Sequence, residues 1–227
     1  MNYILIVVST LRYDLYKQSN TPNMNKISPP VKAHSPTSLS SGSMFFYLHN
    51  QGPLIKKGRT RIIDEIPEWT WLPECLQWKG YKTGFITTKS DFYTKLSSVF
   101  TKGFDEYIEM IYTPLCSDFF IDKAIELIED NREPYFYVIH VCDTHEPYRD
   151  GNYTKAVEAI DRNIGKLLEH VKDCKIVIVG DNGMLMNEEG NFYDEVSKIN
   201  GHEMVYISPI LFRVPLIKGE WKTNGSK

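Results

Sequence analysis

The stretch Ile176-Val177-Ile178-Val179-Gly180-Asp181-Asn182-Gly183 decides the fold class of this 227-residue chain. Its four consecutive β-branched apolar residues are typical of a strand that is buried on both faces of a parallel sheet. Asp181 and Asn182 then place a carboxylate and an amide at the carboxyl end of that strand, where open α/β sheets bind their ligands. The stretch therefore predicts an α/β fold with a candidate site at this turn.

The composition is that of an ordinary globular chain. Hydrophobic residues make up 42% of it, charged residues 24%, and the formal net charge is −3. That balance gives no electrostatic argument for binding nucleic acids or membrane surfaces. The basic segment from Lys56 to Arg61 is a local exception, and it fits either a solvated loop or an anion-binding patch. We expect one compact domain over residues 1–227.

The cysteines and the amino-terminal residues indicate the cellular compartment in which the protein is expected. The four cysteines are far apart and form no CxxC pair, so they suggest neither a zinc knuckle nor a disulfide framework. The chain begins with the strand-like residues 2–8, without a basic leader or a small-residue cleavage site. No other apolar stretch approaches the length of a membrane span. These features predict a soluble cytoplasmic protein with no membrane partner.

Strand and helix patterns alternate along the chain. Apolar runs predict strands at 3–8, 83–87, 135–141, 175–179 and 212–217. Helical spacing predicts helices around 71–79, at 118–130 and at 153–172, while residues 9 to 66 are expected to be loop-rich. Pro215 favours an edge or irregular position for the last strand. The pattern predicts a mostly parallel sheet sandwiched between helices.

Three strand ends carry polar residues, and in a parallel sheet they converge on one edge. These are residues 9–10, 143–146 and 181–182. Asp181 and Asn182 offer oxygen donors that suit a hard divalent cation, and His145 can donate to an anionic oxygen or act as a general acid. Each cluster also has a structural explanation, because Asp-Asn-Gly is a good turn sequence and Asp143 can cap the following helix.

Eight segments in order carry a family resemblance, including Asp143-Thr144-His145-Glu146-Pro147-Tyr148 and Val179-Gly180-Asp181-Asn182-Gly183. The others are residues 2–14, 21–24, 35–42, 78–84, 102–107 and 213–217. Together they resemble the sulfatase branch of the alkaline phosphatase superfamily. The resemblance implies that family's α/β fold. Because the chain is shorter than typical members, we expect it to lack the usual carboxyl-terminal subdomain that closes over substrate.

The resemblance also implies a chemistry. A divalent cation activates a nucleophile that attacks a small-molecule or polymer-linked sulfate or phosphate ester, while histidines steady the anion. Asp181 and Asn182 match metal ligands, with calcium expected first and magnesium, manganese or zinc as alternatives. His145 matches a substrate-binding histidine. His202 falls near a second such histidine, although a loop histidine explains it equally well.

Two departures from the family pattern bear on activity. Ser9 and Thr10 stand where the family has acidic metal ligands, so up to two negative charges are missing and cation affinity should fall sharply. The nucleophile segment contains neither the expected cysteine nor the following arginine. Ser35, Thr37 and Ser38 are the candidate attacking hydroxyls, and helix capping is their alternative role.

Two functions from different classes follow. The first is a metal-dependent hydrolase or transferase acting on sulfate or phosphate esters. The alternative is a catalytically inactive relative that keeps the fold as a binding or interaction module. The intact clusters at Asp181 and His145 favour retained ligand binding in either case.

Overall fold

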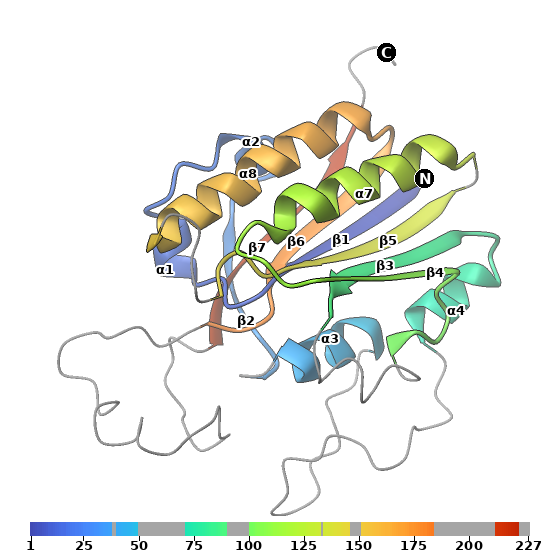
Figure 1. Cartoon of the computed structure of the whole chain (residues 1–227), viewed down its shortest axis with the longest axis horizontal. Coiled ribbons are helices and arrows are strands. Elements are labelled where there is room, and N and C mark those ends of the chain that lie inside the picture. Colours follow the sequence, from blue (N-terminus) through green and yellow to red (C-terminus); the bar gives the residue numbers. More distant parts are fainter. Residues whose placement is uncertain are drawn as a thin grey trace, which may run out of the picture.

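The computed structural model describes residues 1–37, 40–49, 71–89, 100–132, 134–145, 151–183 and 212–222. Within them lies one seven-stranded sheet of order β2-β7-β6-β1-β5-β3-β4 (Figure 1). Its strands are β1 (Asn2–Val8), β2 (Val31–His34), β3 (Lys82–Thr88), β4 (Glu106–Met110), β5 (Tyr135–Val141), β6 (Cys174–Gly180) and β7 (Arg213–Trp221).

The sheet is mostly parallel, as predicted. β1 runs parallel to β5 on one side and to β6 on the other, and β3 continues the parallel pairing to β4. β7 is antiparallel to both β6 and β2. Val8 pairs with Val141 and with Gly180, so the carboxyl ends of β1, β5 and β6 are level with one another.

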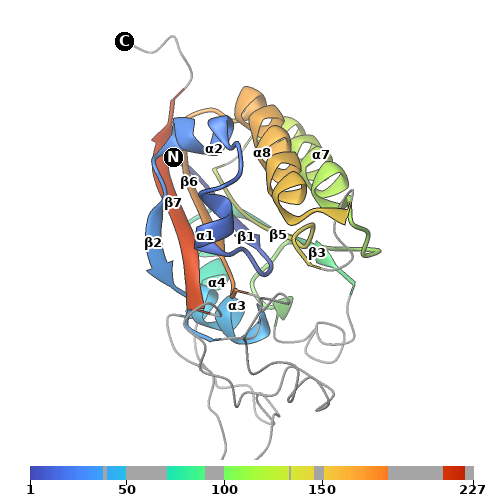
Figure 2. The same cartoon turned by 90° about the vertical axis from the view of Figure 1, so that its left-hand side faces the viewer.

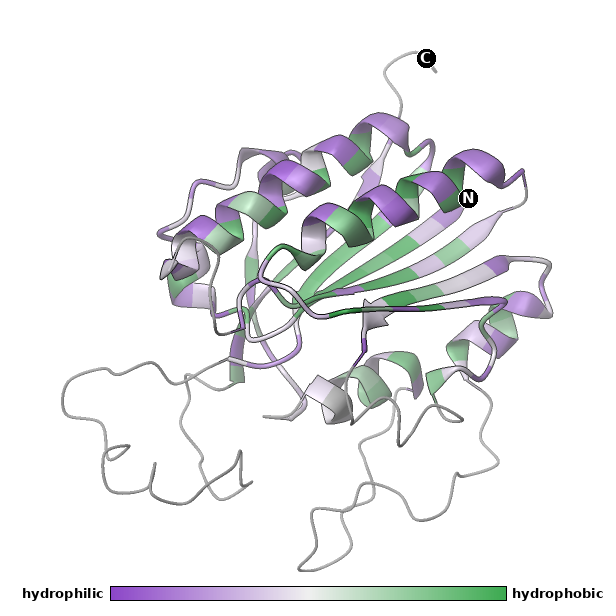
Figure 3. Ribbon diagram, viewed as in Figure 1, coloured by the Kyte–Doolittle hydropathy of each residue, from purple (hydrophilic) through white to green (hydrophobic). Residues whose placement is uncertain are grey.

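Helices cover both faces of the sheet (Figures 1 and 2). One face carries α1 (Tyr13–Tyr16), α2 (Pro22–Ile27), α7 (Cys116–Asp130) and α8 (Tyr153–His170). The other carries α3 (Ser40–His49) and α4 (Leu72–Gln77). Figure 3 shows hydrophilic residues recurring along α7 and α8 above a largely hydrophobic sheet. None of the helices in the described part of the chain has the length and apolar character needed to cross a membrane.

Side-chain alternation along β1 divides the core into two layers. Ile4, Ile6 and Val8 belong to the core beneath α7 and α8. Val7 belongs to the opposite core, where it joins Phe45 of α3 and its neighbours. Successive side chains along a strand point to opposite faces of the sheet. The second layer is the one that brings α3 to the carboxyl edge of the sheet.

Three sequence expectations differ from the structure. The described part of the stretch predicted as loop-rich contains α1, α2, β2 and α3, which are short or lack a clear polar face. β7 is not an edge strand, because the four-residue β2 lies outside it and places Lys32 opposite Pro215. The edge strand β4 was not predicted, since all five of its residues are half-buried and show no alternation. The other predicted strands and helices match within a few residues.

Candidate functional site

The carboxyl ends of the central strands meet as the sequence predicts. The Asp181 amide donates to the Val8 carbonyl (3.2 Å), and the Ser9 amide donates to the Val141 carbonyl (2.8 Å). These bonds extend the sheet by one residue beyond β1 and β6. They place Ser9, Thr10 and Asp181 side by side at the edge where α/β sheets carry their sites.

Asp181 is fully buried, and both of its carboxylate oxygens have protein partners. Oδ1 accepts the Thr10 backbone N–H (2.8 Å), and Oδ2 lies 3.3 Å from His140 Nε2. A carboxylate can only accept, so His140 Nε2 carries the proton of this bond. Thr87 Oγ1 lies 3.3 Å from His140 Nδ1 on the far side of the ring. His140 was not among the predicted site residues, although a histidine among the apolar residues of a buried strand is the signal that points to it.

The electrostatics of His140 reflect its surroundings. Burial lowers the pKa of the imidazole, but nearby Cys142 and the hydrogen-bonded Asp181 outweigh burial and raise it above the ordinary value. A buried carboxylate needs such a donor, since an uncompensated buried charge is strongly unfavourable. His140 thus stabilises the Asp181 charge from within the sheet.

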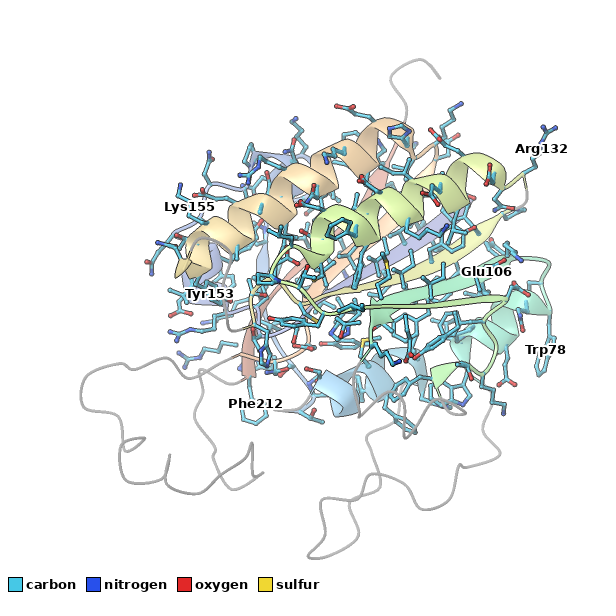
Figure 4. All side chains as sticks on the ribbon, in the orientation of Figure 1. Trp78, Glu106, Arg132, Tyr153, Lys155 and Phe212 are labelled. Atoms are coloured by element: carbon cyan, nitrogen blue, oxygen red, sulfur yellow. The ribbon has the colours of Figure 1, made fainter. Side chains whose placement is uncertain are left out.

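Thr10 has a left-handed backbone, with φ of 59°. β-branched residues rarely adopt this conformation, which costs on the order of 1–3 kcal/mol. Its hydroxyl donates to the Thr144 carbonyl (2.6 Å), and its carbonyl accepts the Tyr153 hydroxyl (2.8 Å). Tyr153 opens α8 beside this edge (Figure 4). These bonds offset the strain and aim the Thr10 N–H, rather than its hydroxyl, at Asp181.

Asn182 and Ser9 are joined by a serine that was not among the predicted site residues. Ser40 is the first residue of α3, and its hydroxyl donates to Asn182 Oδ1 (3.3 Å) and lies 3.4 Å from Ser9 Oγ. Tyr47 of the same helix donates to the Gly180 carbonyl (2.8 Å), which holds α3 against the end of β6. The first turn of a helix presents backbone N–H groups and the positive end of the helix dipole. Ser40 therefore places a hydroxyl where an anion is favoured.

The predicted nucleophiles lie just before α3. The Ser35 hydroxyl donates to the Thr37 carbonyl (2.8 Å), and Thr37 Oγ1 lies 3.2 Å from Ser43 Oγ. These bonds are local and fix the entry to the helix, which is the structural role weighed against nucleophilic attack. Ser38 lies outside the described residues. So does His202, the second predicted substrate-binding histidine.

His145 lies on the turn that follows β5. Its backbone N–H donates to the Cys142 carbonyl (3.0 Å), and its carbonyl accepts the Tyr112 hydroxyl (3.0 Å). Its ring centroid is 6.4 Å from that of Tyr112. These contacts anchor the backbone of the turn at the same edge of the sheet as Asp181.

Asp143 has a structural role. It accepts the backbone N–H (2.9 Å) and the hydroxyl (2.6 Å) of Ser117, and the Cys116 thiol also donates to it. Burial raises the pKa of its carboxyl, while these bonds oppose the rise. Capping of the following helix was the predicted alternative to a functional role. The capped helix is instead the preceding one, α7, because β5 returns the chain to the start of that helix.

The described residues do not by themselves fit a divalent cation. Calcium takes about six to eight oxygen ligands, several of them carboxylates. In the described part of the chain the turn offers one carboxylate, Asp181, with the amide of Asn182 and the hydroxyls of Ser9 and Ser40. Among the described residues, no group of three or more His, Cys, Asp and Glu side chains is arranged to hold a metal ion.

The family model named Sulfatase matches residues 2–220 of this chain. The chain belongs to the sulfatase family. The match covers the helices and all of the sheet except the last residue of β7, which confirms the resemblance found in the sequence. A search of curated proteins gave no match.

Solved structures confirm the fold. Ps i-CgsB, crystallised in complex with k-i-k-neocarrahexaose, aligns with a TM-score of 0.70 and 17% identity over 96% of this chain and 65% of its own. A protein in the alkaline phosphatase superfamily from Vibrio parahaemolyticus gives 0.67 and 14%, covering 97% and 60%. The C-terminal periplasmic domain of EcEptC from Escherichia coli, in complex with Zn, gives 0.67 and 14%, covering 98% and 73%. The sulfatase family chain thus has the alkaline phosphatase superfamily fold, and it spans about two thirds or less of the length of the first two proteins.

Proposed function

We propose that this sulfatase family chain binds a sulfate or phosphate ester at the carboxyl edge of its sheet and hydrolyses it or transfers its sulfuryl or phosphoryl group. The observation that supports the proposal is the position of Ser40. Its hydroxyl opens α3 and bonds to Asn182 beside Ser9. An ester anion at this helix terminus lies close to the backbone N–H groups of the first turn and to a nucleophilic oxygen.

The chemistry follows from that arrangement. Ser40 Oγ bonds to the sulfur or phosphorus as the bond to the leaving alcohol oxygen breaks, and the hydroxyl proton passes to that alcohol. Water, or an acceptor alcohol in a transferase, then displaces Ser40 from the covalent ester. The N–H groups of α3 stabilise the charge that develops on the non-bridging oxygens. Asn182 orients the hydroxyl by accepting its hydrogen bond.

Other parts of the proposal stay predictions. His145 steadies the anion, with His202 as a second candidate, and the ester is either a small molecule or attached to a polymer. A cytoplasmic location also stays a prediction, and one similar structure is a periplasmic domain. A divalent cation, calcium first, is implied by the family resemblance. No step above depends on it, since the described donors do not fit one.

A second function has an observation in its favour. The described part of the site offers a single carboxylate, and protein donors contact both of its oxygens. That arrangement favours an inactive binding module, in which the anion occupies the site without turnover. The two functions share a location and differ in whether Ser40 reacts.

Turnover of aryl esters separates the two functions. The wild-type chain is incubated with 4-nitrophenyl sulfate, 4-nitrophenyl phosphate and bis(4-nitrophenyl) phosphate, with EDTA and with each cation in turn. We expect turnover of at least one ester and a loss of roughly 10³-fold or more in Ser40→Ala, because the attacking oxygen is removed. Ser35→Ala is the matched control, and it should retain activity. Binding of inorganic sulfate or phosphate without turnover of any ester would favour the inactive module.

A further inference from the structure

The described neighbours of Asp181 give it hydrogen-bond donors rather than further ligands for a cation. A metal-bound carboxylate also accepts hydrogen bonds, but a cation site needs several more oxygen or nitrogen ligands around that carboxylate. Here the partners of both Asp181 oxygens are donors: the Thr10 N–H at 2.8 Å and His140 Nε2 at 3.3 Å. Neither group has a lone pair to offer a metal in this arrangement, since each directs its hydrogen toward the carboxylate.

The residues after β1 strengthen this contrast. Ser9 and Thr10 supply no carboxylate, and the Thr10 hydroxyl is directed to the Thr144 carbonyl. The left-handed backbone of Thr10 turns its N–H toward Asp181. A strained residue persists only where its surroundings hold it, and here two further hydrogen bonds do so. The loop is therefore built to donate to Asp181 rather than to ligate an ion beside it.

His140 completes the arrangement from the sheet. It is buried in β5, with Thr87 on the side of the ring away from Asp181. A buried carboxylate held by a backbone N–H and an imidazole has the compensation that a cation otherwise supplies. We propose that the Asp181 centre of this chain is organised without a metal ion, with His140 and the Thr10 N–H in place of the cation. The inference rests on the proposed function only for the location of the site.

Thermal unfolding of the full chain tests this without any measurement of activity. A cation that binds only the folded state must raise Tm, and EDTA must lower the Tm of a protein purified with its metal. We expect the wild-type Tm to be the same in EDTA and with calcium, magnesium, manganese or zinc. A rise in Tm with any of these cations that is lost in Asp181→Asn would overturn the proposal.

A double-mutant cycle between His140→Phe and Asp181→Asn tests the bond itself. Removing the imidazole leaves the carboxylate buried with one donor, so His140→Phe should lower Tm by several degrees in wild type and much less beside Asp181→Asn. The exposed pair of His170 and Glu129 (2.7 Å) provides the matched control, and its cycle should show little coupling. Additive effects at His140 and Asp181 would contradict the proposal. If His140→Phe does not fold, the change in wild-type Tm with added cations still tests the proposal. Loss of turnover would bear on the proposed function alone.

Discussion

Asp143 and Asp181 are two fully buried carboxylates at neighbouring strand ends, and their contacts separate their roles. Asp143 accepts hydrogen bonds from the first turn of α7, so its charge is used in capping that helix. Asp181 accepts from the loop after β1 and from His140. Sequence position alone does not distinguish the two residues, because each follows a buried strand.

Asp143→Ala should lower the stability of the chain without altering the position of the candidate nucleophile Ser40. The substitution leaves the Ser117 N–H and hydroxyl without their acceptor, which costs roughly 2–4 kcal/mol in the free energy of unfolding. Urea unfolding measures the change. Asp122→Ala, at an exposed position of the same helix, is the control and should change stability by less than about 0.5 kcal/mol. Equal effects of the two substitutions would show that the cap contributes nothing.

The site residues that were predicted from the sequence and those that were not differ in whether their contacts are local in the chain. Asp181 and Asn182 form a local motif after a buried strand, so they are visible without the fold. Ser40 and His140 become site residues only through contacts with residues far away in the chain, Asn182 and Asp181. Serine is common at helix starts, and only the packing of α3 makes this one a candidate nucleophile.

At the scale of elements, the position of α3 decides whether Ser40 reaches the site. Phe45 packs in the second core layer, and the Tyr47 hydroxyl bonds to the Gly180 carbonyl. This helix was not predicted because most of its described side chains are buried and no polar stripe marks it. The packing against β6 therefore supplies what the sequence pattern lacks.

Tyr47→Phe should reduce turnover by loosening this contact. Losing one hydrogen bond costs about 1 kcal/mol of stability, and displacement of α3 should lower kcat in addition. Tyr107→Phe removes the bond from Tyr107 to Glu109 (2.9 Å) on the edge strand β4, and it serves as the matched control. Comparable stability with lower kcat only in Tyr47→Phe is the expected result. A similar kcat in both variants would show that the contact between Tyr47 and Gly180 does not position Ser40 for the reaction.

Across the whole molecule, the central strands and the long helices could be predicted from the sequence, whereas the edge strands could not. β1, β5 and β6 are continuous apolar runs because both of their faces are buried, and α8 has one apolar and one polar side. β2 and β4 are edge strands with half-buried or exposed residues and carry no such pattern. The parallel order of the central strands then brings the predicted polar ends together.

Stability should fall in alkali through the buried tyrosines. Burial, with the nearby negative charges of Glu106 and Asp105, raises the pKa of Tyr137 to about 12. Between pH 10 and about 12 the unfolded chain loses this proton while the folded chain keeps it, so the free energy of unfolding falls as pH rises. Urea midpoints across this range measure the fall. Tyr137→Phe should make it shallower, and an unchanged slope would contradict the assignment.

A covalent ester on Ser40 is the intermediate that the proposed reaction requires, and mass spectrometry of the acid-quenched reaction detects it. Wild-type chain is mixed with the aryl ester that it turns over best, quenched, digested and fragmented. We expect a sulfuryl or phosphoryl group on Ser40 and none in Ser40→Ala, which should also have lost turnover. A group on Ser35, Thr37 or Ser38, or turnover that survives in Ser40→Ala, would contradict it.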